Sequence, residues 1–257
     1  MLKYLRQFRQ RLLAKNQTGK YLLYAGGEII LVVIGILIAL QINNWNEERL
    51  AREQESIYYC KIKEDLELDR NSLVGILEDN HKRTEIGKKL LLKLHQTPKD
   101  KSVIMDDYLS AVRSNVFYPN NSAITDITSS GKLWLLQDGK LKEQILRYYT
   151  DMDNFLSIVH KNQSEVTDRI FQYDNALEFG AHQTFYREEF GEELMALLPD
   201  VNWQRDKESP YFKKFEEHIA IAVIIAAREK QVLSTLQARI EQILPSLDQV
   251  CKVRPIE

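Results

Sequence analysis

One acidic residue interrupts the longest apolar stretch of the chain, and it is the residue best suited to chemistry. The stretch runs from Tyr21 to Ile42, and Glu28 is its only charged side chain. A carboxyl group inside a membrane span is costly and commonly marks a proton or ion pathway. Small residues nearby would let a second helix approach closely. These helix-packing candidates are Gly26, Gly27, Gly35 and Ala39.

Two interpretations of Glu28 stay open. In the first, Glu28 is a proton or ion site in an oligomer, as in the single-pass subunits of proton-driven motors, which share this order of tail, span and exported domain. In the second, which we favour, the carboxyl is protonated, extends to the nearby membrane interface or hydrogen-bonds across a helix pair. The motor analogy rests on topology alone.

The rest of the chain contains fragments of catalytic, cofactor and metal motifs, but none of these motifs is complete. The segment Ser129 to Lys132 resembles part of a phosphate loop, but Asp126 and Leu133 stand where that motif needs Gly and Ser or Thr. The five His residues have no paired metal spacing, and His81 with Glu85 is a common surface arrangement. We therefore expect no enzyme, no bound cofactor and no metal.

Cys60 and Cys251 are the only cysteines. In an oxidising compartment an even number of cysteines permits a disulfide. Cys60 lies near the start of the soluble part and Cys251 near the end of the chain, so a returning last helix would bring them together. A disulfide is one alternative, and two buried free thiols are the favoured one.

The element that positions Glu28 is a predicted transmembrane helix over residues 21–43. Twenty-two residues rise about 33 Å as a helix, close to the ~30 Å thickness of the hydrocarbon layer. Ten Ile, Leu and Val residues between Ile29 and Leu40 outweigh the cost of one acid. The aromatic residues expected at the two membrane interfaces are Tyr21, Tyr24 and Trp45. No cleavage pattern of a signal peptide follows the stretch.

Charge is distributed unevenly about this helix. Residues 1–20 carry six Lys or Arg and no acid, whereas the chain after Ile42 holds 29 basic and 36 acidic residues, a net charge of −7. The excess of basic residues before the span predicts a cytoplasmic N-terminus. Leu2, Leu5, Phe8 and Leu12 recur at helical spacing, so 1–20 is expected to be a basic amphipathic segment.

Residues 44–257 are predicted to form an exported, all-α domain, an antiparallel helical bundle in the periplasm. We expect a long helix from Glu47 to Leu94, and a short one near Asp106 to Arg113. A turn capped by Ser122 should follow, with a helix that stops at Gly131. Asp138 should cap a long helix to about Phe179, and the last helix should run from Ser209 to Leu244 and end at Pro245. The apolar run Ile219 to Ala227 is expected at the bundle centre.

Two segments resemble a known family. These are KYLLYA with GEI and IGILIALQINNWNEE, between Lys20 and Glu48, and SSGKLWLLQDGKLKEQILRYY, from Ser129 to Tyr149. They are similar to an uncharacterised bacterial family of single-pass inner-membrane proteins whose domain has no assigned function. The resemblance implies an inner-membrane helical protein and brings no catalytic residues with it.

The sequence thus leads to two functional hypotheses. The first is a membrane-anchored periplasmic helical domain that acts as a binding, sensory or scaffold module, with the lipid bilayer, further copies of itself or another membrane protein as partners and no nucleic acid. The second is a subunit of an ion- or proton-conducting assembly built around Glu28.

Overall fold

The computed structural model describes residues 18–96, 100–113, 115–171, 184–198 and 201–253. Within these ranges every regular element is helical, which confirms the predicted all-α class. The chain divides into two compact units, Met1–Glu55 and Ser56–Glu257. Most of the predicted amphipathic segment 1–20 lies outside the described residues.

The first unit contains the beginning of helix α2, which spans Thr18–Gln96. Its large apolar side chains from Ile29 to Ile42 are 46–73% exposed. Among the described residues, one helix is long and apolar enough to cross a membrane, and its most apolar window has a mean hydropathy of 2.3 with none of it buried. Length and composition of this kind belong to a membrane span or to a signal sequence.

In the second unit, α2 pairs with the last helix, α8, which spans Pro210–Val253. Four contacts join them in opposite chain directions: Cys60 to Cys251, Lys63 to Asp248, Arg83 to Glu229 and His95 to Glu216. From the first contact to the last, each helix advances 35 residues, or roughly 53 Å of helical rise. The two helices are therefore antiparallel and keep one register over this distance.

Both helices bury residues at alternating spacings of three and four, the pattern of a heptad seam. On α8 the seam runs from Phe212 to Leu247, and each of its positions is buried. Its members are Phe212, Phe215, Ile219, Ala222, Ala226, Glu229, Leu233, Leu236, Ile240, Ile243 and Leu247. On α2 the members are Tyr59, Ile62, Leu66, Asp69, Leu73, Ile76, Asn80, Arg83, Gly87, Leu90 and Leu94. Polar residues thus enter both seams.

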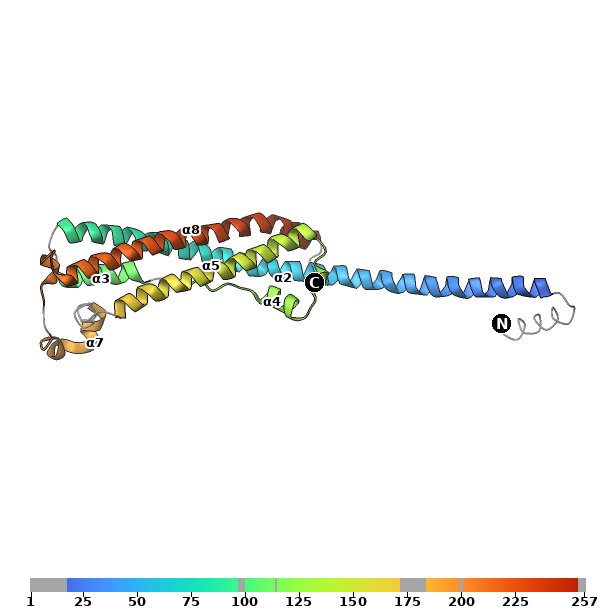
Figure 1. The fold of residues 1–257 in the computed structure, drawn as a ribbon, viewed down its shortest axis with the longest axis horizontal. Helices are drawn as coiled ribbons and strands as arrows, with labels where there is room; N and C mark the ends of the chain where they lie inside the picture. The colour runs from blue at the N-terminus through green and yellow to red at the C-terminus, as the bar shows by residue number, and fades with distance from the viewer. Residues whose placement is uncertain (1–17, 97–99, 114, 172–183, 199–200, 254–257) are drawn as a thin grey trace. The chain divides into compact units, whose positions relative to one another are not determined.

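The other long helix, α5 (Gly139–Phe171), lies beside α8, as Figure 1 shows. Asp138 accepts a hydrogen bond from the Leu141 N–H at 3.0 Å, which confirms its predicted capping role. Arg239 of α8 pairs with Asp151 of α5 at 2.6 Å. At helical spacing, α5 buries Leu141, Ile145, Tyr148, Tyr149, Met152 and Val159. The predicted end near Phe179 lies outside the described residues.

Shorter elements complete the second unit. They are α3 (Lys101–Val112), α4 (Ser122–Ser129), η1 (Leu133–Leu135), α7 (Thr184–Met195) and η2 (Trp203–Arg205). An aromatic cluster joins α3 and η2 to α8, with ring centroids of Tyr108 and Trp203 each 4.9 Å from that of Phe215. Gly131 follows α4 with φ +70°, and this left-handed residue ends the helix at the predicted place.

Two expectations for α8 are wrong. The helix continues through Pro245 to Val253, although proline removes one backbone hydrogen bond at a cost of about 3 kcal/mol. Buried Leu247 and the disulfide at Cys251 lie beyond the proline and hold the last turns in place. The run Ile219 to Ala227 is not enclosed on all sides, because Ile224 is 66% exposed. Neighbouring helices leave the Ile224 side of that run uncovered.

Gly87 permits close approach of α2 and α8, and this generates a stability prediction. A β-carbon on Gly87 would lie 2.6 Å from Cγ2 of Val223, whereas one on Gly75 would meet nothing within 4 Å. Within a helix, alanine is more stable than glycine by about 1 kcal/mol, so Gly75→Ala should stabilise the chain by about 0.5–1 kcal/mol. Gly87→Ala should destabilise it by about 1–3 kcal/mol, since stiff, branched Val223 must move.

Urea unfolding of the full chain in detergent, followed by circular dichroism, measures both variants. Equal stabilisation by the two substitutions would contradict the close approach at Gly87.

Candidate functional site

A cavity of about 290 Å³ opens beside the polar part of the heptad seam in the second unit. Three elements supply its lining: the middle of α2, the end of α3 with the segment after it, and α8. The residues from α2 are Ile76, Asp79, Asn80, Lys82, Arg83 and Ile86, and the others are Ser110, Arg113, Asn115 and Glu229.

A buried ion pair forms one wall of the cavity. Nη2 of Arg83 donates to Oε2 of Glu229 at 2.5 Å, and the two side chains are 8% and 3% exposed. Nδ2 of Asn80 donates to the same oxygen at 3.3 Å. Burial raises the pKa of the Glu229 carboxyl, and the Arg83 guanidinium opposes this rise. The pair thus brings opposite charges from α2 and α8 into the seam.

Three buried polar atoms of this wall have no hydrogen-bond partner among the residues that the structure describes. They are Nε of Arg83, Oδ1 of Asn80 and Oε1 of Glu229. Burying such a group without a partner costs about 1–3 kcal/mol, so native proteins usually supply a partner. One atom is a donor and two are acceptors. The wall can therefore satisfy a molecule that both donates and accepts hydrogen bonds.

The mouth of the cavity carries further charges. Asp79 accepts a hydrogen bond from Nδ2 of Asn115 at 2.7 Å, which fixes the segment after α3 against α2. Lys82 pairs with Glu78 at 2.8 Å on the outer face of α2. The backbone carbonyl of Arg113 accepts from Nη1 of Arg83 at 3.4 Å. The lining as a whole contains three cationic and two anionic side chains.

Metal coordination and nucleophile activation each require a particular set of neighbouring side chains. In the described ranges, no group of three His, Cys, Asp or Glu side chains is placed to hold a metal ion. Among the described lining residues, Ser110 is the one with a hydroxyl side chain, and its Oγ donates to the carbonyl of Asp106 at 3.1 Å and not to a base. In the described part of the lining, Ser110 therefore lacks the neighbouring base that activates a serine nucleophile.

A second buried polar cluster has a structural role. Asp65 accepts hydrogen bonds from Oγ of Ser122 at 3.0 Å and from the Ala123 N–H at 2.9 Å, at the first turn of α4. Asp65 of α2 therefore caps α4, whereas the sequence suggested that Ser122 would do so. Asp69 accepts from the backbone and side chain of Asn120 and from the Tyr148 hydroxyl. Burial raises the pKa of Asp69, and these donors oppose the rise.

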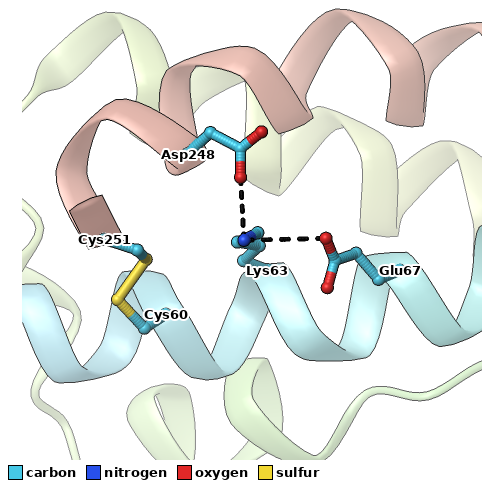
Figure 2. Close-up of a disulfide and its surroundings, with 5 residues drawn as sticks. All are labelled: Cys60, Lys63, Glu67, Asp248 and Cys251. Atoms are coloured by element: carbon cyan, nitrogen blue, oxygen red, sulfur yellow. Dashed lines mark ion pairs between the residues drawn. A yellow bond between two sulfur atoms is a disulfide. The ribbon is translucent and has the colours of Figure 1, made fainter. Parts of the chain in front are cut away.

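Cys60 and Cys251 form a disulfide with a Cα to Cα distance of 5.6 Å. The alternative of two free thiols, which the sequence favoured, is therefore wrong in this structure, because the antiparallel register places the two residues opposite each other. Figure 2 shows the disulfide beside Lys63, whose Nζ lies 2.8 Å from Asp248 and 3.6 Å from Glu67. The cross-link closes the chain over 191 residues and ties the end of α8 to α2.

The residues that the sequence singled out in and around the predicted span lie in the first unit, and none of them is a lining residue of the cavity. Glu28 is partly exposed on α2, and a β-carbon on Gly26, Gly27 or Gly35 would meet nothing within 4 Å. Ala39 is exposed, and Trp45 is 70% exposed. Tyr21 and Tyr24 belong to α2, but their side chains lie outside the described residues. The proposed roles of these residues remain predictions.

Sequence reasoning missed the cavity, although one signal was available. Glu229 occupies a seam position of α8, between Ala226 and Leu233, where the spacing calls for an apolar residue. Asn80 and Arg83 occupy seam positions of α2 in the same way. Polar residues on an otherwise apolar seam mark a buried polar layer. This signal identifies the polar layer on each helix, but it does not show which residue of α2 contacts which residue of α8.

The buried ion pair supports a testable prediction. Glu229→Leu leaves the Arg83 charge buried without its partner, so it should destabilise the domain by about 3–5 kcal/mol. The double variant Arg83→Met with Glu229→Leu removes both charges and should recover most of that loss. Urea unfolding of the three full-length proteins in detergent measures both effects. A double variant as unstable as the single one would contradict the pairing.

Comparison with known proteins identifies a family and no activity. The model of a family of unknown function, DUF6090, matches residues 28–179, which is more than half of the chain. The matched segment contains Glu28 and Arg83 and ends before α8 and Glu229. No curated protein and no solved structure matches. The chain belongs to the DUF6090 family of unknown function.

Proposed function

We propose that this chain is a membrane-anchored sensory or binding protein whose exported helical domain binds a small polar solute beside the Arg83–Glu229 pair. One observation carries the proposal: a cavity of about 290 Å³ whose wall includes the buried side chains of Asn80, Arg83 and Glu229, each with an unpaired hydrogen-bonding atom. Cavities with a few convergent polar groups are the usual form of small-molecule sites.

The anchor is the apolar part of α2. Its side chains from Ile29 to Ile42 are exposed in the single chain, and an apolar surface of this extent is normally covered by lipid or by another protein. Six basic residues before the span favour a cytoplasmic N-terminus. The Cys60–Cys251 disulfide supports an oxidising compartment for the domain, as in the periplasm. We therefore place the protein in a bacterial inner membrane with its antiparallel helical bundle outside.

A purely structural role for the polar layer is the main competing explanation. A buried ion pair can fix the register of paired helices, as polar seam residues do in coiled coils. Register alone, however, would be served by an ion pair with all of its atoms satisfied. The unpaired Nε of Arg83 and Oε1 of Glu229 beside an open cavity favour ligand binding in addition.

The ion-conducting alternative places function at Glu28 instead. It requires several copies of the span around a polar axis, and Gly35 and Ala39, which are four residues apart on one side of the helix, offer a face on which helices could associate. The same face serves an oligomeric anchor equally well. We propose a homo-oligomer joined through this face as the state in which the exported domain works.

Filling the cavity tests the binding proposal. Ser110 lines the cavity with an exposed side chain, so Ser110→Phe should fill it without touching the ion pair, while Ser110→Ala should leave it open. The full chain in lipid nanodiscs is screened by thermal shift against amino acids, sugars, nucleotides and organic acids. We expect at least one class to raise the melting temperature of the parent and of Ser110→Ala, with affinity at least about tenfold weaker in Ser110→Phe.

The proposal is wrong if no compound class shifts the melting temperature. It is also wrong if binding is the same in Ser110→Phe as in Ser110→Ala, because the solute then binds elsewhere.

Cysteine labelling tests the topology. In a variant with Cys60 and Cys251 replaced by serine, single cysteines are introduced at Gln10 and at exposed Lys140 of α5. A membrane-impermeant maleimide added to spheroplasts should label Lys140→Cys, and should label Gln10→Cys only after lysis. The reverse pattern would place the domain in the cytoplasm.

A further inference from the structure

We propose that the solute bound in the Arg83–Glu229 cavity is a small zwitterion, an α-amino acid with an apolar side chain. This inference rests on the proposed function and adds the chemical class of the ligand. The structure supplies three independent arguments: the kinds of atom left unpaired, the charges at the mouth, and the size and polarity of the lining.

The unpaired atoms require a ligand with both donors and acceptors. An ammonium group can donate to Oε1 of Glu229 and Oδ1 of Asn80, and a carboxylate can accept from Nε of Arg83. An anion such as phosphate would satisfy the Arg83 donor and face the two acceptors unfavourably. A simple cation would do the reverse. A zwitterion satisfies both sets at once, so it fits this wall better than either.

These three atoms are covered from solvent in the chain without a ligand. A ligand therefore reaches them only when the Arg83 and Glu229 side chains turn toward the cavity. Such a movement exchanges part of the ion pair for contacts with the ligand's two charged groups. The exchange keeps each buried charge next to an opposite charge, which is the condition for burying them at acceptable cost.

The charged side chains at the mouth of the cavity also suit a zwitterion. Lys82 lines the cavity from α2, and Arg113 lines it from the residue directly after α3. With Arg83 they make the cationic side chains outnumber the anionic ones by one. The ligand's carboxylate is attracted to these cations, and its ammonium group to Glu229. The same excess of cations disfavours a divalent metal ion.

Size and apolar lining restrict the ligand further. A volume of about 290 Å³ is at the lower end of the roughly 300–1,000 Å³ of typical ligand pockets. It therefore suits one amino acid and excludes a folded peptide or a polysaccharide chain. Ile76 and Ile86 supply apolar surface to the lining. An apolar side chain on the ligand would cover that surface.

Binding of leucine and two analogues tests the inference. The full chain in nanodiscs is titrated with L-leucine, with leucinamide, which lacks the carboxylate, and with N-acetyl-L-leucine, which lacks the ammonium group. Isothermal titration calorimetry and thermal shift should both detect L-leucine, and each analogue should bind at least about tenfold weaker. The three probes share one side chain, so a difference among them reports on the charged groups alone.

Two lysines on α2 provide a matched pair of variants. Lys82 lines the cavity and pairs with Glu78, whereas Lys88 does not line it and pairs with Glu85 at 2.9 Å. Both are exposed, so neither substitution should affect folding. Lys82→Gln should weaken L-leucine binding at least about threefold, and Arg113→Gln should do the same. Lys88→Gln should leave the affinity unchanged.

The outcomes separate this inference from the proposed function. If N-acetyl-L-leucine or leucinamide binds as tightly as L-leucine, the zwitterion inference is overturned, while the cavity remains a binding site. Equal effects of Lys82→Gln and Lys88→Gln on L-leucine affinity would also overturn it, because Lys82 would then make no specific contact with the ligand's carboxylate. If Ser110→Phe weakens the binding of a different class of solute only, the binding function stands and the ligand class is wrong. If no solute binds and the unpaired atoms hold water alone, both fail.

Discussion

The structure of the second unit depends on one buried ion pair, between Arg83 of α2 and Glu229 of α8. Removing two charges from water is costly, and the cost is offset only when the two meet with good geometry. A shift of α2 against α8 by one heptad would bury both charges without partners. The pair therefore selects one register among those that the leucines and isoleucines of the two seams would allow. Polar seam residues define alignment in coiled coils for the same reason.

Other contacts extend this register to the ends of the two helices. At one end the Cys60–Cys251 disulfide and the Lys63–Asp248 pair hold the last turns of α8, which therefore remain helical past Pro245. At the other end the aromatic rings of Tyr108, Trp203 and Phe215 bring α3 and η2 onto α8. A covalent clamp and an apolar cluster thus act on either side of a polar middle layer. The cavity lies beside this polar layer.

This arrangement relates stability to function. The polar layer sets the alignment of the helices, and it also contains the atoms that lack hydrogen-bond partners among the described residues. A solute that pairs with those atoms would stabilise the same register that the ion pair selects, because it would bind the folded domain and not the unfolded chain. In the proposed sensory function, ligand binding has to change the stability of one arrangement of the helices. The DUF6090 match, which ends before Glu229, covers only the α2 and α3 side of the cavity.

The sequence by itself determined the long helices, because local signals suffice for them, whereas α7, η1 and η2 were not predicted. Helical periodicity gave the long helices, Asp138 and Gly131 gave a start and an end, and the uninterrupted apolar residues around Ile29 to Leu40 gave a helix able to cross a membrane. Only the tertiary structure decided what meets across the helices. Residues 146 positions apart form the ion pair, and 191 positions separate the two cysteines. No local preference encodes such distances, since register results from the packing of whole helices. For the same reason the helix end at Pro245 was misjudged: its local cost is offset by contacts that exist only once α2 and α8 are aligned.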